Sequence, residues 1–296
     1  VDSVTVTNPY LLQVIKMKYP NLKVCVSSFA RVNSIEKAKY WEEFGADRIT
    51  LDYTTMNRNF RQLREIRKAV KCKIQLIANN SCLYFCPFVI YHDNIVSHAS
   101  QSGDYLKGFI VDYCLIACRF KRIRNPVEFI RSGWIRPDDV SYYHDIGIDS
   151  IKLVDRGRPT EEISSIVKAY VNGRYHGNLI DLFPLLSGKP RMSISDKIHV
   201  AKYLFRPLSI NILKFKRIAE LLAERVNVYI DNRALDGFID YFLKEDCTLK
   251  ACQECLYCEK IAKQVIKIEP AYQEEMISKY ESAIKTILSG EIFKCI

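Results

Sequence analysis

The chain has 296 residues, of which 48% are hydrophobic and 26% are charged. These fractions are those of a globular protein large enough to bury a sizeable core, and they exclude a disordered or fibrous protein. The formal net charge is +10, but the basic residues are spread over the whole length, so basicity alone does not indicate a nucleic-acid binder. The hydrophobic runs are short and interrupted by Lys, Arg or Asp, whereas a membrane span needs about twenty consecutive apolar residues. We therefore expect no membrane segment.

An αβ unit recurs in the first half of the chain. Residues 44–51 and 146–153 share a pattern in which a helix ends, a glycine provides a left-handed turn, and a β-branched strand follows an aspartate. The spacing of these units predicts βαβ crossovers, and hence a parallel sheet of the doubly wound or (β/α) barrel type. The expected strands are at 4–6, 24–26, 49–51, 74–77 and 151–154. The expected helices around them are at 34–44, 59–70, 138–146 and 161–170.

A closed (β/α) barrel has eight strands, more than this chain provides. The chain begins with Val1 rather than Met, and it opens on a strand whose preceding glycine turn is missing. We therefore expect the early strands either upstream of Val1 or in a second polypeptide.

A long insertion separates the fourth and fifth strands. It covers residues 81–150 and includes a strand-like run at 109–111, and long ordered insertions are usually functional. After about residue 190 the pattern becomes mainly helical. We expect helices there at 197–205, 210–224 and 271–288, and one strand at 227–230. We interpret residues 1–190 as a barrel portion carrying the insertion, and residues 191–296 as a separate helical module.

Cysteines are the most informative residues of the insertion. The chain has 11 of them, clustered at metal-ligand spacings without a secretory signal, which favours a reducing cytoplasm over a disulfide framework. Cys82 and Cys86 form one pair, and Pro87 disfavours a helix there. Cys114 and Cys118 form a second pair that suits a helix. Four thiolates from two segments can bind one zinc ion or one iron–sulfur cluster, and a buried structural role is the alternative.

A second cysteine group lies in the C-terminal module. Its members follow one another at short spacings, as Cys247, Cys252, Cys255 and Cys258. Two consecutive two-residue spacers resemble the run with which ferredoxins bind a cubane cluster, and four cysteines in a short span also suit structural zinc. Both metals remain open for this group.

Polar residues near the first group are candidates for contact with a substrate. His92 and Arg156 are the candidates for catalytic roles, although a lone histidine is more often structural, and Arg156 could hold a carboxylate or phosphate. The candidates for substrate binding are Asn79, Asn80, Asp112, Arg119, Lys152 and Asp155. The sequence has no Gly-x-Ser-x-Gly elbow, His-Glu-x-x-His helix or Walker loop.

Several motifs in residues 1–172 agree with one known family. They are the strand and turn at 4–12, the strand at 26–32, the segment 48–51, the segment 150–153 with Arg156, and the cysteines of the insertion with Pro87 and His92. Together they resemble the U32, or collagenase-like, peptidase family. Phe29, residues 52–54, residues 79–80 and Val154 depart from the family's motifs, which indicates an altered substrate pocket.

The resemblance implies a TIM-like (β/α) barrel and a 4Fe-4S cluster bound by Cys82, Cys86, Cys114 and Cys118. Relatives are implicated in oxygen-independent hydroxylation of RNA or a quinone precursor, some with prephenate as oxygen donor. We therefore expect an iron–sulfur oxidoreductase acting on an RNA, peptide or small molecule with a prephenate-like oxygen donor. The alternatives are a peptidase of the collagenase-like type, and a cluster-bearing subunit that needs a related partner. For the C-terminal group we expect a second 4Fe-4S cluster or zinc.

Overall fold

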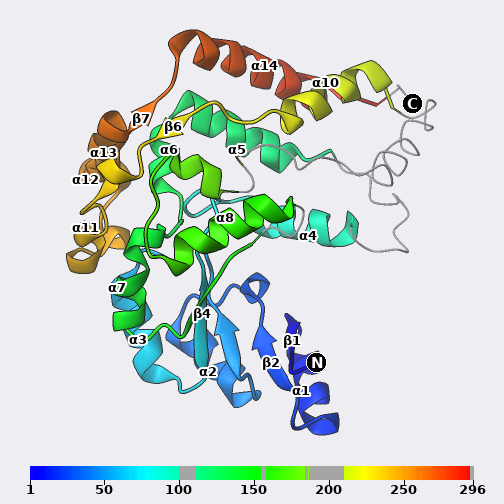
Figure 1. The fold of residues 1–296 in the computed structure, drawn as a ribbon. Coiled ribbons are helices and arrows are strands. Elements are labelled where there is room, and N and C mark those ends of the chain that lie inside the picture. Colours follow the sequence, from blue (N-terminus) through cyan, green and yellow to red (C-terminus); the bar gives the residue numbers. More distant parts are fainter. Residues whose placement is uncertain (100–110, 155–157, 184–185, 187–209, 294–296) are drawn as a thin grey trace.

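The computed structural model describes residues 1–99, 111–154, 158–183, 186 and 210–293 (Figure 1). The expected helix at 197–205 lies outside these residues, as do two of the three residues of the strand expected at 109–111. Val111, the third, is not in a strand.

Five parallel strands form the main sheet, in the order in which they occur along the chain. They are β1 (Ser3–Val6), β2 (Lys23–Val26), β3 (Arg48–Thr50), β4 (Lys73–Ile77) and β5 (Ser150–Lys152). All five strands predicted from the sequence are thereby confirmed. A sheet whose strands follow chain order differs from a doubly wound sheet, in which the order reverses at a switch point. Within the described residues, β1 and β5 are the two edges of this sheet.

Three amphipathic helices connect the first four strands. They are α1 (Pro9–Lys18), α2 (Ile35–Glu43) and α3 (Phe60–Ala69). Each begins after a polar residue whose side chain accepts a hydrogen bond from the first turn, namely Asn8, Ser34 and Asn59. Each of them buries an apolar face, which for α3 consists of Phe60, Leu63 and Ile66.

The repeated glycine-aspartate turn positions two of the strands. Asp47 Oδ2 accepts hydrogen bonds from the amide of Val24 and from Nζ of Lys16, both at 2.6 Å. In the second unit, Asp149 Oδ2 accepts a hydrogen bond of 2.8 Å from the amide of Ile74. In both units the aspartate therefore joins the turn to the start of a neighbouring strand, and the preceding glycines have φ of 100° and 87°.

Helices predominate in the rest of the described chain. They are α4 (Val89–Ala99), α5 (Tyr113–Arg124), α6 (Val127–Arg131), α7 (Val140–Asp145), α8 (Thr160–Val171), α10 (Ile212–Ala223), α11 (Asp240–Lys244), α12 (Cys252–Cys255), α13 (Tyr257–Val265) and α14 (Pro270–Leu288). Two short strands, β6 (Tyr229–Ile230) and β7 (Ile266–Lys267), pair antiparallel. Short 3-10 helices are at Ser28–Ala30, Pro137–Asp139, Leu179–Leu182, Arg233–Leu235 and Cys247–Leu249.

The C-terminal helices pack on the insertion. Helix α14 lies along α5 and α13 lies along α6 (Figure 1). Gln273 in α14 donates a hydrogen bond of 2.7 Å to the carbonyl of Ile123 in α5. Trp134 stacks with Phe183 and packs against Phe238, with ring centroids 6.1 and 5.5 Å apart. The division of the chain into a barrel portion, residues 1–190, and a separate helical module, residues 191–296, stays a prediction. Among the described helices, none is both long and apolar enough to cross a membrane.

Candidate functional site

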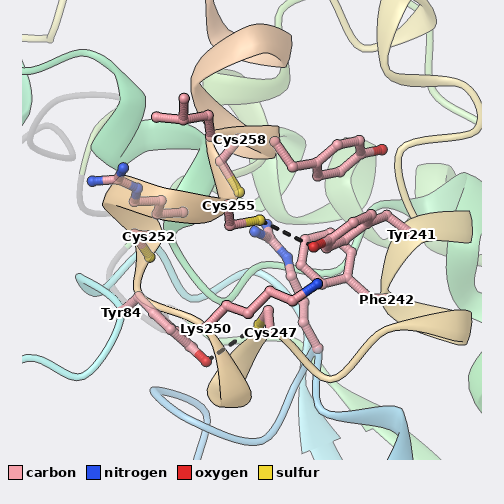
Figure 2. A pocket seen from close by; sticks show the side chains of 12 residues that line it. Tyr84, Tyr241, Phe242, Cys247, Lys250, Cys252, Cys255 and Cys258 are labelled. Carbon is pink, nitrogen blue, oxygen red and sulfur yellow. Dashed lines mark hydrogen bonds between the residues drawn. The ribbon is translucent and has the colours of Figure 1, made fainter.

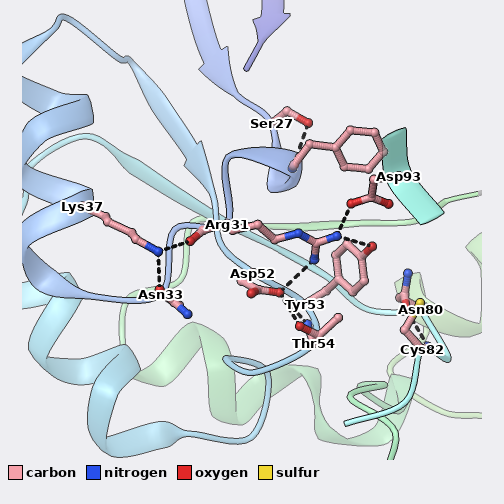
Figure 3. Close-up of polar contacts among 11 residues, drawn as sticks. Ser27, Arg31, Asn33, Lys37, Asp52, Tyr53, Thr54, Asn80, Cys82 and Asp93 are labelled. Atoms are coloured by element: carbon pink, nitrogen blue, oxygen red, sulfur yellow. Dashed lines mark hydrogen bonds and ion pairs between the residues drawn. The ribbon is translucent and has the colours of Figure 1, made fainter. Parts of the chain in front are cut away.

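The polar residues of the site gather at the carboxyl edge of the main sheet. Arg31 follows β2, Asp52 and Tyr53 follow β3, and the loop carrying Cys82 follows β4. Figure 3 shows these side chains converging on one region. Parallel α/β sheets place their binding sites at this edge, because every strand ends there in a loop.

Arg31 is the centre of the charged network at this edge. Its guanidinium donates hydrogen bonds of 3.1 Å to Asp52 Oδ1 and to the Tyr53 hydroxyl, and it also pairs with Asp93. The backbone of Arg31 is left-handed, with φ of 51°, a conformation that costs a non-glycine residue energy and is retained where surrounding contacts hold it. The network therefore combines one cation with two carboxylates.

This network adjoins the first cysteine pair. Burial raises the pKa of Tyr53, and the negative charge of Cys82 raises it further. Burial also raises the pKa of Asp93. Sequence reasoning missed Arg31, and it noted residues 52–54 only as a departure from the family. The available signal was their position, since Asp52 directly follows the strand predicted at 49–51 and Arg31 lies in the loop after the strand predicted at 24–26.

We call Cys82, Cys86, Cys114 and Cys118 the first cysteine centre. Cys82 and Cys86 lie in the irregular loop between β4 and α4, as predicted. Cys114 and Cys118 lie one turn apart on one face of α5. Burial raises the pKa of Cys82 to about 12, and the charges of Cys118 and Cys86 contribute. Burial raises that of Cys114 to about 11, with contributions from Cys86 and Cys118. The thiols of the loop and those of the helix therefore influence one another electrostatically.

A buried arginine lies beside these thiols. Arg122 is 2% exposed, and it donates hydrogen bonds to the carbonyl of Ser81 and, at 3.3 Å, to the hydroxyl of Ser132. Burial raises the pKa of Cys118, whereas Arg122 lowers it. Within the described residues the Nε atom of Arg122 has no hydrogen-bond partner, and no carboxylate forms an ion pair with its guanidinium. The nearby groups that could become anions are the thiols of Cys118 and Cys82, on which the charge of Arg122 acts.

His92 and Asp112, both predicted site residues, lie together. His92 Nε2 is 3.1 Å from Asp112 Oδ2, and this hydrogen bond raises the pKa of His92. The other carboxylate oxygen of Asp112 accepts a hydrogen bond of 2.9 Å from the amide of Leu115 and so caps the N-terminus of α5. One carboxylate therefore orients the histidine ring and begins the helix that carries Cys114 and Cys118.

The two predicted asparagines bond to the backbone. Asn79 is 1% exposed. Its Oδ1 accepts a hydrogen bond of 2.8 Å from the amide of Val154. Its Nδ2 donates hydrogen bonds of 3.0 Å to the carbonyl of Val154 and 3.4 Å to the carbonyl of Leu182. Asn80 Oδ1 accepts the amide of Cys82 at 2.7 Å. Asn79 thus joins the loop after β4 to the chain after β5, and Asn80 shapes the loop that carries Cys82.

Two further sequence candidates are Arg119 and Lys152, and the charge of Arg119 acts against burial to lower the pKa of Cys118. Arg119 donates hydrogen bonds of 2.9 and 3.2 Å to the carbonyls of Leu222 and Glu224 at the end of α10, where a cation is favourable. Lys152 is exposed on β5. Asp155 and Arg156 lie outside the described residues.

We call Cys247, Cys252, Cys255 and Cys258 the second cysteine centre. All four line one pocket together with Arg58, Tyr84, Tyr241 and other residues (Figure 2). Cys252 and Cys255 are the ends of α12, and Cys258 lies in the first turn of α13. The backbone between the two helices reverses at Leu256, whose φ is 53°.

Two tyrosine hydroxyls contact thiols of the second centre. The Tyr241 hydroxyl is 3.0 Å from Cys255 Sγ, and the Tyr84 hydroxyl is 3.5 Å from Cys247 Sγ. Burial raises the pKa of Cys258 to about 11, whereas Arg58 lowers it. In neither centre, within the described part of the chain, do three or more side chains already stand as ligands of a metal ion.

Comparisons with known proteins identify the family. The model of Peptidase family U32 matches residues 1–174, close to the range of the resemblance found in the sequence. The uncharacterized protease MJ1657 of Methanocaldococcus jannaschii is 33% identical over 269 residues, which are 91% of this chain and 68% of that protein. The solved structure of the U32 peptidase Mk0906 is 27% identical with a TM-score of 0.38, and the match covers 54% of this chain and 56% of that one. The chain belongs to Peptidase family U32.

Proposed function

We propose that this protein is an iron–sulfur enzyme that carries out a redox modification, such as an oxygen-independent hydroxylation, beside the Arg31 network. In this proposal the first cysteine centre holds a four-iron four-sulfur cluster. Family membership supports an enzyme, and the mutual electrostatic influence of thiols from a loop and a helix supports a thiophilic cofactor.

The observation that carries the proposal is Arg122. A buried guanidinium without a compensating anion is strongly destabilising. The groups on which the charge of Arg122 acts are the thiols of Cys118 and Cys82, which become anionic when they bind a metal. Protonated thiols would leave the guanidinium uncompensated, whereas a cluster held by four thiolates carries a net negative charge. Metal-bound thiolates therefore fit this surrounding better than free thiols.

The side chains of the first centre would close around the cluster by rotation, since no three of its described side chains already stand as ligands. When bound, such a cluster supplies single electrons or a Lewis-acidic iron. The chain's own residues would orient and protect the substrate. Asp112 fixes the ring of His92, and the Arg31 network forms the polar wall next to Cys82.

The charge of the network favours certain substrates. Asp52 and Asp93 together outweigh the single guanidinium of Arg31. A group that donates hydrogen bonds, such as a sugar hydroxyl or a base amino group, fits this wall better than a free carboxylate. We therefore propose RNA or another hydroxyl-rich molecule as the substrate class, with a peptide as the alternative. A prephenate-like oxygen donor would need cations other than Arg31.

A peptidase is the second candidate. The names of the family and of the Methanocaldococcus relative favour it, and a histidine oriented by a carboxylate is an arrangement that hydrolases use. Within the described residues, the hydrogen-bond partner of the His92 ring is Asp112, and no thiol or hydroxyl nucleophile is bonded to it. For that reason the redox function ranks first.

We also propose that the five-stranded sheet is part of a (β/α) barrel. The sequential strand order supports this proposal, because neighbouring strands of such a barrel follow one another in the chain. The edges β1 and β5 would then pair with strands from another segment or from a related subunit. The protein would act as one cluster-bearing part of a heteromeric complex in the second case.

Anaerobic purification followed by iron and sulfide analysis tests the proposed function. We expect the absorption band of a four-iron cluster in the wild type, and its loss in Cys86→Ser. Cys72→Ser is the matched control, because Cys72 belongs to neither centre. Unchanged iron in Cys86→Ser would overturn the cluster assignment. Peptide cleavage by the iron-free protein would favour the peptidase.

A further inference from the structure

We infer that Cys247, Cys252, Cys255 and Cys258 form a second metal centre, which binds a thiophilic metal as a tetrathiolate and holds in place the loop carrying Cys82 and Cys86. The metal is a zinc ion or an iron–sulfur cluster, since both take four thiolates. The site itself stands independently of the proposed function, whereas its effect on the first centre rests on that function.

The backbone of the C-terminal module brings the four thiols to one pocket. Leu256 breaks the chain between α12 and α13 with a left-handed conformation. The reversal lets Cys258 face the same space as Cys252 and Cys255, while Cys247 approaches from the preceding 3-10 helix. In Figure 2 the four side chains surround this space, with Tyr84 and Tyr241 at its edge.

Arg58 provides an independent indication of a bound anionic group. Its side chain lines the same pocket and is 5% exposed, and one terminal nitrogen donates a hydrogen bond to the carbonyl of Ile130. Among the described residues, neither Nε nor the other terminal nitrogen has a hydrogen-bond partner. The guanidinium lies 4.1 Å from the ring centroid of Trp134 and 4.9 Å from that of Phe238. Burial lowers the pKa of Arg58, and the charges of Cys258 and Cys247 act in the opposite direction.

The charge balance favours thiolates at this pocket. No carboxylate among the described residues forms an ion pair with Arg58, although the charge of Asp139 acts on it from beyond ion-pair distance. An anion in the pocket would therefore compensate its buried charge more fully. When a zinc ion binds four thiols, four sulfur–hydrogen bonds are replaced by four sulfur–zinc bonds and four protons pass to solvent. The resulting complex carries a net charge of minus two, which the guanidinium offsets in part. An iron–sulfur cluster whose core has a charge of plus two, bound by the same four thiolates, has the same net charge of minus two.

Tyr84 connects this pocket to the first centre. It lies between Cys82 and Cys86 in the same loop, yet its hydroxyl contacts Cys247. The loop reverses at Phe85, which has φ of 47° and whose amide donates a hydrogen bond of 3.3 Å to the carbonyl of Thr54. The loop therefore carries ligands for one centre while its tyrosine forms part of the wall of the other. Metal in the second centre would fix this wall and preorganise Cys82 and Cys86.

Metal analysis of the full-length protein tests the site. Zinc, iron and sulfide are measured per chain in the wild type, Cys255→Ser and the control Cys72→Ser. We expect Cys255→Ser to lose about one equivalent of zinc, or the iron and sulfide of one cluster, while Cys72→Ser loses neither. Zinc or iron lost with Cys255 supports the proposal and identifies the metal. Equal metal content in all three proteins overturns it.

Thiol alkylation of the wild type tests the same site without a substitution that could unfold the protein. The four cysteines of the second centre should be protected from iodoacetamide in the loaded protein and become reactive together after chelation, with Cys72 as the internal reference. Equal labelling of these cysteines before and after chelation overturns the proposal. If Cys82 and Cys86 are never protected while the C-terminal four are, the proposed function fails and this site stands.

Discussion

The hydroxyl of Tyr84 lies 3.5 Å from Sγ of Cys247, although 163 positions separate the two residues in the sequence. This contact joins the loop of the first cysteine centre to the wall of the second. The two centres are therefore one structural unit, and a change at one of them should be measurable at the other.

Replacing Tyr84 by Phe should weaken this connection without removing a thiol. The hydroxyl bond is worth about 1 kcal/mol, so we expect iron of the first centre to be lost several-fold faster when a chelator is added. The decay of the cluster absorption band measures this rate. Tyr40→Phe, at an exposed tyrosine of α2, is the control. Equal decay rates in the two variants would show that the loop is held by other contacts.

Replacing Arg58 by Met should have opposite effects in the metal-free and metal-loaded protein. Without metal the buried cation lacks a full counter-charge, so Arg58→Met should raise the free energy of unfolding by about 1 kcal/mol or more. With metal the cation is needed, and the substitution should weaken metal retention. Urea unfolding with and without chelator separates the two effects, and Arg233→Met on the exposed surface is the control. A loss of stability in both states would contradict a compensating role for the thiolates.

Asn79 should contribute to stability and not to substrate binding. Asn79→Ala removes hydrogen bonds to Val154 and Leu182 and leaves buried backbone groups without partners, which costs about 1–3 kcal/mol. We expect a lower urea midpoint and unchanged metal content. Asn94→Ala, at an exposed position of α4, should change neither. A normal urea midpoint combined with weakened substrate binding would instead support the substrate-binding role that the sequence predicts for Asn79.

Asp47 should make stability fall at acid pH. Burial acts to raise the pKa of Asp47, but the hydrogen bonds from Lys16 and from the amide of Val24 lower it on balance. A carboxyl whose pKa is lower in the folded state stabilises above its unfolded pKa of about 3.9, and this contribution is lost as pH falls through the folded value. Its side chain is 38% exposed, so the effect should be about 1 kcal/mol or less.

Urea unfolding between pH 6 and pH 3 measures this contribution. Asp47→Asn should be less stable than the wild type at pH 6, and the difference should shrink toward pH 3. Asp145→Asn, at an exposed aspartate of α7, should follow the wild type throughout. A difference that grows as the solution is acidified would mean that the sign of the Asp47 contribution is wrong.

The sequence by itself determined the elements whose causes are local. Glycine-aspartate turns, β-branched runs and amphipathic stretches act over a few positions, and they predicted all five parallel strands and the helices α2, α3, α7 and α8, but not α1, α4 or α6. The cysteine spacings and Pro87 also placed the first pair in a loop. Together with the strand motifs of residues 1–172 they indicated the family to which the chain belongs. These signals needed no knowledge of distant contacts.

The tertiary structure alone decided which distant side chains meet. Arg58 on the loop before α3 lines the pocket of the C-terminal cysteines, Arg31 pairs with Asp93 across 62 positions, and Asn79 bonds to the backbone of Val154 and Leu182. Residue type does not encode such pairings, because a buried arginine or asparagine has the same local preferences whichever partner satisfies it. Tertiary packing determines the partner, as where the C-terminal helices α13 and α14 pack on the insertion.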